Sequence, residues 1–155
     1  MENGHKVIQE EEQENLDWPA LSKYKKDNHE LKLKSNSGKR IVFMGDSITE
    51  GWSGIYPDFF QNKNYINRGI SGQTTAQMLI RFRADVVDLN PSIVIILAGT
   101  NDIAENTGPS NVKMITDNIF SMSELAMAHK IKVILCSILP VYTYSWKDIP
   151  DPPSY

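Results

Sequence analysis

Four short apolar segments constrain the fold of this chain more than any other feature of the sequence. SIVIILAG at residues 92–99 is the clearest of them, and RIVFMG at residues 40–45 shows no alternation of apolar and polar residues. A run of this kind is typical of a parallel strand that is buried on both faces. Two further strands are predicted at residues 64–68 and 131–141. Together these segments predict a sheet built mainly of parallel strands.

Helices are predicted before and between these strands, at residues 14–31, 56–60, 74–90 and 111–130. Asp17 is expected to cap the first of them, with Pro19 in its first turn. Thr74 or Thr75 is expected to cap the third, which Pro91 stops. Strands that alternate with helices indicate an α/β fold around a parallel sheet.

The composition fits a single compact domain. The chain has 155 residues, of which 41% are hydrophobic, and a formal net charge of −3. Its pI of about 5.6 leaves no broad basic face for a nucleic acid partner. The single Cys136 excludes an internal disulfide. The acidic run at residues 9–14 predicts a flexible arm over residues 1–14, followed by one domain over residues 15–155.

No apolar run approaches the roughly 20 residues of a membrane-spanning helix, so no membrane span is expected. The first ten residues, MENGHKVIQE, lack the apolar centre of a signal peptide. The expected location is therefore the cytoplasm, or outside the cell if a signal peptide has been removed.

Unusual residues follow three of the predicted strands. Asp46 and Ser47 come directly after the first strand, Gly72 lies in NRGISGQTT after the second, and Asn101 lies in LAGTNDIA after the third. In an open parallel sheet, functional residues gather at the carboxyl ends of the strands. We therefore expect these three segments to meet at one rim of the sheet.

Each segment also has a purely structural interpretation. Gly-Asp-Ser is ordinary turn chemistry, and Gly69 and Gly72 suit loop positions with positive φ. Asn101 and Asp102 suit the cap of a following helix. A chemical interpretation explains the three segments together. A serine at a tight turn exposes its Oγ as a nucleophile, while its own N–H, a glycine N–H and an asparagine carboxamide supply an oxyanion hole.

In this order and spacing, FMGDSITEGW, NRGISGQTT and LAGTNDIA resemble the first three sequence blocks of GDSL-type esterases in the SGNH hydrolase superfamily. The branch is that of lysophospholipase-like acylhydrolases and of the catalytic subunits of intracellular platelet-activating-factor acetylhydrolase. The resemblance covers roughly residues 15–145 and implies a flavodoxin-like three-layer sandwich. It also implies an acyl-enzyme route without a metal or organic cofactor, and a homodimer is compatible with it.

The resemblance implies a role for four residues. Ser47 is the nucleophile, and its N–H forms the oxyanion hole together with Gly72 and Asn101. Asp46 supports the loop that carries the serine. The expected substrates are small acyl esters, acetyl esters above all, of a carbohydrate or a lipid. No metal site is expected, and the sequence singles out no substrate-binding residues.

The sequence departs from the family at the fourth block, D-x-x-H, which supplies the base histidine and its aspartate. His5 lies in the acidic arm, His29 in the first predicted helix and His129 at the end of the long helix. None of them matches this block. The base is therefore expected beyond residue 155, with a last strand and helix that this chain lacks, and this piece alone is expected to be impaired.

Two other functions stay open from the sequence. One is a catalytically inactive member of the same fold that binds an ester or glycan. The other is a phosphotransferase that uses Asp46, although position 48 is Ile where that motif needs a second Asp. Aromatic residues after the strand ends either line a substrate cleft or pack the loops, and these are Trp52, Tyr56, Tyr142, Tyr144 and Trp146.

Overall fold

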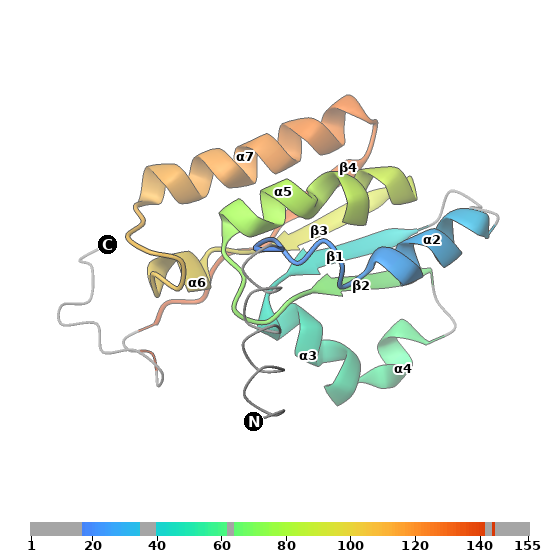
Figure 1. Cartoon of the computed structure of the whole chain (residues 1–155), viewed down its shortest axis with the longest axis horizontal. Helices are drawn as coiled ribbons and strands as arrows, with labels where there is room; N and C mark the ends of the chain where they lie inside the picture. The colour runs from blue at the N-terminus through green and yellow to red at the C-terminus, as the bar shows by residue number, and fades with distance from the viewer. Residues whose placement is uncertain (1–16, 35–39, 62–63, 142–143, 145–155) are drawn as a thin grey trace, which may run out of the picture.

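The computed structural model describes residues 17–34, 40–61, 64–141 and 144. A parallel sheet forms its middle layer, with helices on both faces (Figure 1). The described strands are β1 (Ile41–Gly45), β2 (Tyr65–Gly69), β3 (Ile93–Leu97) and β4 (Lys132–Leu135). Their order in the sheet is β2-β1-β3-β4, which is the start of a flavodoxin-like sheet. The predicted α/β fold class is therefore confirmed.

The register brings three strand ends together. Gly45 at the end of β1 pairs with Gly69 at the end of β2 and with Leu97 at the end of β3. Because all pairs are parallel, the segments that follow these strands emerge at one rim of the sheet. This is the rim that the sequence predicts as the functional one.

The two faces of the sheet are covered differently. Helices α5 (Thr75–Asp85) and α7 (Val112–Ala128) cover one face, and α3 (Ser47–Ile55) with α4 (Pro57–Phe60) covers the other beside β1 and β2. The main core lies under α5 and α7 and includes Val42, Met44, Ile66, Met78, Phe82, Val94, Ile96 and Met122. Aromatic rings fill the space under α3 and α4, and these are Phe43, Trp52, Phe59, Phe60 and Tyr65.

The predicted helices after β2 and before β4 are confirmed. Thr74 is the N-cap of α5 and forms a capping box with Gln77, so the choice between the two threonines falls on Thr74. A short 3₁₀ turn, η1 (Val87–Leu89), follows before Pro91. Asn111 caps α7 by accepting a hydrogen bond from the N–H of Met114 at 2.9 Å.

The predicted helix at residues 14–31 begins later than expected. Helix α2 spans Lys25–Leu33, and residues 17–24 form turns in which Ala20 has a φ of 54°. Asp17 is not the cap of α2, because its carboxylate accepts hydrogen bonds from the N–H groups of Leu21 and Ser22 within these turns. The predicted strand at 131–141 is also too long, since β4 ends at Leu135.

Helix α3 replaces the loop expected around Ser47 after β1, and a short helix, α6 (Thr100–Ile103), follows β3. The predicted acidic arm at residues 1–14 lies outside the described residues, as do residues 145–155. No helix in the described ranges is long and apolar enough to cross a membrane.

Candidate active site

Ser47 is the first residue of α3, directly after β1. Its side chain is exposed, whereas Asp46 before it is 1% exposed. Asp46 is the N-cap of α3, and its carboxylate accepts a hydrogen bond from the N–H of Ile48 at 2.9 Å. The prediction of a loop after Ser47 is therefore wrong. A helix N-terminus suits a nucleophile whose reaction develops negative charge, because its first N–H groups lack intrahelical acceptors.

The surroundings of Asp46 suit a structural role and not that of a nucleophile. Burial raises the pKa of its carboxyl above the usual range, and the hydrogen bond from Ile48 opposes this only in part. The nearby charge of Asp102 raises the pKa further. A buried carboxyl that caps a helix is poorly placed to attack phosphate, which argues against the phosphotransferase alternative.

The two glycines after β2 have different roles. Gly72 is exposed and has a φ of +77°, which suits glycine. Gly69 has no positive φ. Instead, a Cβ at Gly69 would lie 2.1 Å from the backbone nitrogen of Glu50, so α3 packs directly on the end of β2. The interpretation of both as positive-φ positions holds for Gly72 only.

Asn101 lies inside α6, where it is 3% exposed. Its Nδ2 donates a hydrogen bond to the carbonyl oxygen of Gln73 at 3.0 Å, which ties α6 to the loop that contains Gly72. Capping of the following helix is not its role, because α6 has Gly99 as its N-cap and α7 has Asn111.

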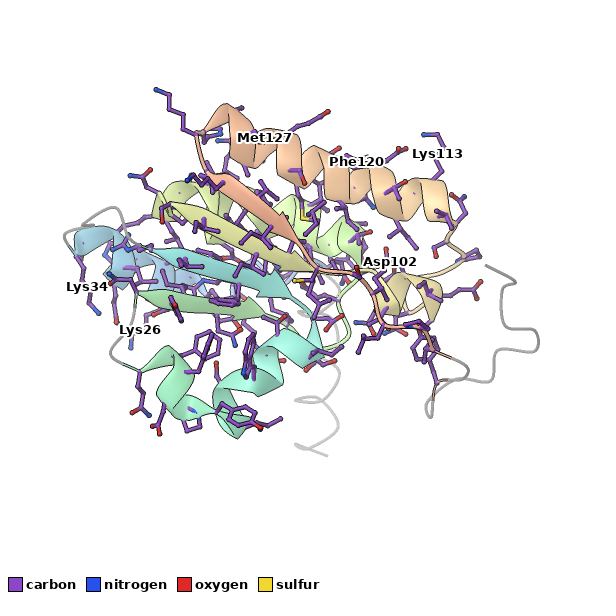
Figure 2. The ribbon with its side chains drawn as sticks, turned by 180° about the vertical axis from the view of Figure 1, so that it is seen from behind. Lys26, Lys34, Asp102, Lys113, Phe120 and Met127 are labelled. Carbon is purple, nitrogen blue, oxygen red and sulfur yellow. The ribbon has the colours of Figure 1, made fainter. Side chains whose placement is uncertain are left out.

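Asp102 caps a different helix from the expected one. Its carboxylate accepts hydrogen bonds from the N–H of Thr75, at 2.9 Å, and from the Thr75 hydroxyl, at the start of α5. Burial raises the pKa of the Asp102 carboxyl, and these two hydrogen bonds oppose the shift. Figure 2 shows Asp102 near the carboxyl ends of the strands, at the opposite end of the sheet from Lys34.

The side chains of Glu50 and Asn106 hold these segments together. Glu50 of α3 accepts hydrogen bonds from the N–H of Ser71, at 2.7 Å, and from its hydroxyl, so α3 is joined to the loop of Gly72. Asn106, after α6, donates from Nδ2 to Gly72 O at 3.2 Å and to Asn101 Oδ1 at 3.0 Å. All three predicted site segments are therefore connected.

A buried arginine that the sequence analysis missed lies beneath the rim. Arg81 of α5 is 0% exposed, and its Nη2 donates to the carbonyl oxygens of Arg68, at 2.8 Å, and Gly45, at 3.2 Å. Its Nη1 pairs with Asp85 at 2.9 Å, and its Nε donates to the Gln73 side chain. Arg81 and Asp85 are spaced i, i+4 among apolar residues, which is the signal in the sequence that could have identified them.

No histidine among the described residues lies at this rim. His129 follows the end of α7 and precedes β4, so it lies at the amino ends of the strands, and its Nδ1 bonds with Leu125 O at 2.8 Å. Figure 2 shows α7 running from Lys113 at the site end to Met127 at the far end. His29 follows Asn28, which bonds with Asp85 at the end of α5. In the described ranges no three His, Cys, Asp or Glu side chains could hold a metal ion.

Two of the three described aromatic residues after the strand ends pack against other groups. Trp52 stacks on Phe59 with 4.5 Å between ring centroids, and Tyr144 is 5% exposed, with its hydroxyl donating to Thr100 O at 3.0 Å. Tyr56 is 63% exposed, whereas Tyr142 and Trp146 lie outside the described residues. An apolar cavity of about 280 Å³ lies beside α3, lined by Phe43, Met44, Ile48, Thr49, Trp52, Ile55, Tyr56, Ile95, Leu97 and Cys136.

The chain matches the model of the GDSL-like lipase/acylhydrolase family over residues 43–154, and it belongs to that family. A GDSL-like lipase from Bacteroides thetaiotaomicron, known from its crystal structure, is similar with a TM-score of 0.79 and 52% sequence identity. The match covers 83% of this chain and 62% of that one.

Two curated relatives are esterases by name. Esterase TesA from Pseudomonas aeruginosa is 28% identical over 120 residues, which are 70% of this chain and 58% of TesA. An acetylxylan esterase from Geobacillus stearothermophilus is 30% identical over 96 residues, which are 46% of this chain and 43% of that esterase. The chain thus spans less than two thirds of each of these three relatives.

Proposed function

We propose that the protein is a serine esterase that hydrolyses small acyl esters, acetyl esters above all, through an acyl-Ser47 intermediate. The observation that carries this proposal is the position of Ser47. It is exposed at the first position of α3, at the rim of the sheet where Gly72 and Asn101 also lie. Membership of the family supports the same assignment.

In the proposed first step, Ser47 Oγ attacks the ester carbonyl carbon and gives up its proton to a general base. The carbonyl oxygen becomes an oxyanion, which accepts hydrogen bonds from the N–H of Ser47, the N–H of Gly72 and Asn101 Nδ2. Collapse of this intermediate breaks the bond to the alcohol oxygen, which takes up the proton. Loss of one such donor typically lowers the rate about 10²–10³-fold.

In the second step, water attacks the acyl-serine carbonyl carbon and the same base accepts its proton. Collapse of this second intermediate breaks the bond between the acyl carbon and Ser47 Oγ, which takes the proton back from the base as the carboxylic acid leaves. The base is not among the histidines of the described residues, because His29 and His129 lie away from the rim. That a D-x-x-H block beyond residue 155 supplies it stays a prediction, as do the impairment of this piece and the homodimer.

The proposed substrates are acetyl esters of a carbohydrate or a lipid. The acetylxylan esterase relative supports an acetylated carbohydrate, and the lipase relative supports a lipid ester. The alternative of an inactive binding member gains no support, since the named relatives are esterases or lipases.

The assignment of Ser47 is tested by replacing Ser47 with Ala in the whole protein and measuring hydrolysis of p-nitrophenyl acetate. We expect kcat to fall by at least about 10⁴-fold, because loss of the nucleophile in serine hydrolases costs several orders of magnitude. Acetyl esters should be cleaved faster than decanoyl esters. Retention of most of the activity in the Ser47→Ala protein would contradict the proposed mechanism.

A further inference from the structure

The carboxamide of Asn106 connects two segments of the site. Its Nδ2 lies 3.2 Å from Gly72 O, in the loop after β2, and 3.0 Å from Asn101 Oδ1 in α6. Both hydrogens of this group are thus used, one toward a backbone carbonyl and one toward the side chain of Asn101. Asn106 itself is exposed.

Two backbone carbonyls fix the orientation of both carboxamides. The atom of Asn106 beside Gly72 O must be nitrogen, since a carbonyl oxygen only accepts. The atom of Asn101 beside Gln73 O must be nitrogen for the same reason. The remaining contact, from Asn106 Nδ2 to Asn101 Oδ1, then joins a donor to an acceptor, so the whole arrangement has one consistent set of hydrogen bonds.

This arrangement determines which hydrogen of Asn101 can serve an oxyanion. Asn101 Nδ2 carries two hydrogens, and within the described residues Gln73 O accepts one of them. If the Asn101 carboxamide rotated about the bond that carries it, the second hydrogen of Nδ2 would point in another direction, away from an oxyanion bound at the site. The hydrogen bond that Asn101 Oδ1 accepts from Asn106 opposes this rotation.

We propose that Asn106 is a positioning residue, which rests on the proposed function: it holds the Asn101 carboxamide so that the second hydrogen of Nδ2 faces the developing oxyanion. Gly72 O anchors Asn106, and Asn101 is the residue through which it acts. Asn106 does not itself touch the substrate.

The side chain of Asn106 can be tested apart from the fold around it. The turn after α6 is held by backbone hydrogen bonds, from Asn106 N to Asn101 O at 3.0 Å and from Gly108 N to Glu105 O at 3.1 Å. Replacement of Asn106 by Ala keeps both. Because the residue is also exposed, the Asn106→Ala protein is expected to fold.

The test is a double-mutant cycle between Asn106→Ala and Asn101→Ala, measured as kcat and KM for p-nitrophenyl acetate in the whole protein. Asn106→Ala alone should lower kcat about five- to tenfold, the size of one neutral hydrogen bond, with KM changed less than about twofold. In the Asn101→Ala background, the same substitution should change kcat less than about twofold, because residues that act through one another are not additive.

Asn118→Ala is the matched control, since Asn118 Nδ2 donates to Thr75 Oγ1 at 3.0 Å, away from the hydrogen bonds of Asn106 with Gly72 and Asn101. It should lower the melting temperature without lowering kcat. An equal loss of kcat from Asn106→Ala in both backgrounds, or a rise in KM in place of the fall in kcat, would overturn the positioning role. Absence of Ser47-dependent hydrolysis in the unsubstituted protein would overturn the proposed function itself, and this inference with it.

Discussion

At the scale of single residues, the place of Ser47 depends on how closely α3 approaches the end of β2. A Cβ on Gly69 would lie 2.1 Å from Glu50 N and 2.7 Å from Asp46 O, both backbone atoms that cannot simply turn aside. Asp46 is the N-cap of α3 and Glu50 lies in its first turn, so the two residues stand on either side of Ser47 along the chain. The absence of a side chain at Gly69 therefore sets the height of Ser47 above the sheet.

Gly69→Ala should destabilise the protein by about 1–3 kcal/mol, because the added methyl overpacks a backbone contact. It should also lower kcat for p-nitrophenyl acetate, since α3 must move. Gly51→Ala is the control in the same helix, where a Cβ would meet nothing within 4 Å. It should leave stability unchanged or raise it by up to about 1 kcal/mol. Equal stability of the two variants in urea unfolding would contradict this account.

Ser47, Gly72 and Asn101 could be predicted to share a rim because each follows a predicted strand, and parallel strands end together. Asn106 and Arg81 could not be predicted in the same way. Their partners lie far away along the chain, as Gly72 does from Asn106 and Gly45 from Arg81. Which residues meet through such contacts depends on the completed fold.

At the scale of elements, α3 is a helix that the local sequence does not predict. It contains Gly51 and Gly54, and glycine is a poor helix former, so its sequence favours a loop. The helix is stabilised by its Asp46 cap and by packing of Trp52 on Phe43 and Phe59. Most helical stability in proteins comes from such tertiary packing, and the helix propensities of the residues do not account for it.

The late start of α2 also has long-range causes. The carbonyl oxygens of Trp18 and Pro19 accept hydrogen bonds from Gln77 Nε2 and Gln73 Nε2, each at 2.8 Å. In a helix starting at residue 14, these carbonyl oxygens would instead accept hydrogen bonds from N–H groups of the same helix. Binding to the loop after β2 and to α5 thus competes with the helix over residues 17–24.

Tyr24 joins this segment to the site, and its ionisation predicts a pH effect. Its hydroxyl donates to Gly69 O, and burial, helped by the charge of Glu50, raises the pKa of Tyr24 to about 12 from 10.0. A raised pKa in the folded state means that this stabilisation is complete below the unfolded pKa of about 10 and is lost as the pH rises through about 12.

The wild-type protein should therefore lose roughly 1–3 kcal/mol more unfolding free energy than Tyr24→Phe between about pH 10 and 12. The Phe variant keeps a ring for Arg68, whose guanidinium carbon lies 4.5 Å from the centre of the Tyr24 ring. Lysine ionisation is common to both proteins and cancels in the difference. Urea unfolding at several pH values measures it, and a difference that does not change with pH would refute the role of this hydroxyl.

At the scale of the whole molecule, Arg81 joins the ends of β1 and β2 to α5 beneath the rim. Removal of one partner of a buried ion pair leaves the other charge uncompensated and typically costs about 3–5 kcal/mol. Arg81→Met should therefore destabilise the protein by about this amount, as measured by urea unfolding. Arg83→Met is the control in the same helix, where the side chain is exposed, and it should change stability by less than about 0.5 kcal/mol. Similar effects of both substitutions would contradict this account.

The sheet could be predicted from sequence because its strands are apolar and the helices between them have a clear period or cap. Thr74 with Gln77 and Asn111 are local capping signals, and the helices that follow them begin as expected. The length of β4 could not be predicted, because the apolar run continues to Val141 while the paired strand β3 ends at Leu97. Pairing with a neighbour, rather than apolar content, sets the end of that strand.

The most direct test of the central claim is peptide mass spectrometry of the whole protein, acid-quenched during turnover of p-nitrophenyl acetate. The account predicts an added mass of one acetyl group on the peptide that contains Ser47. The acetyl group should be absent from the Ser47→Ala protein. Turnover with an acetyl group on another residue, or with an unmodified Ser47 under conditions that trap acyl-enzymes, would contradict the account.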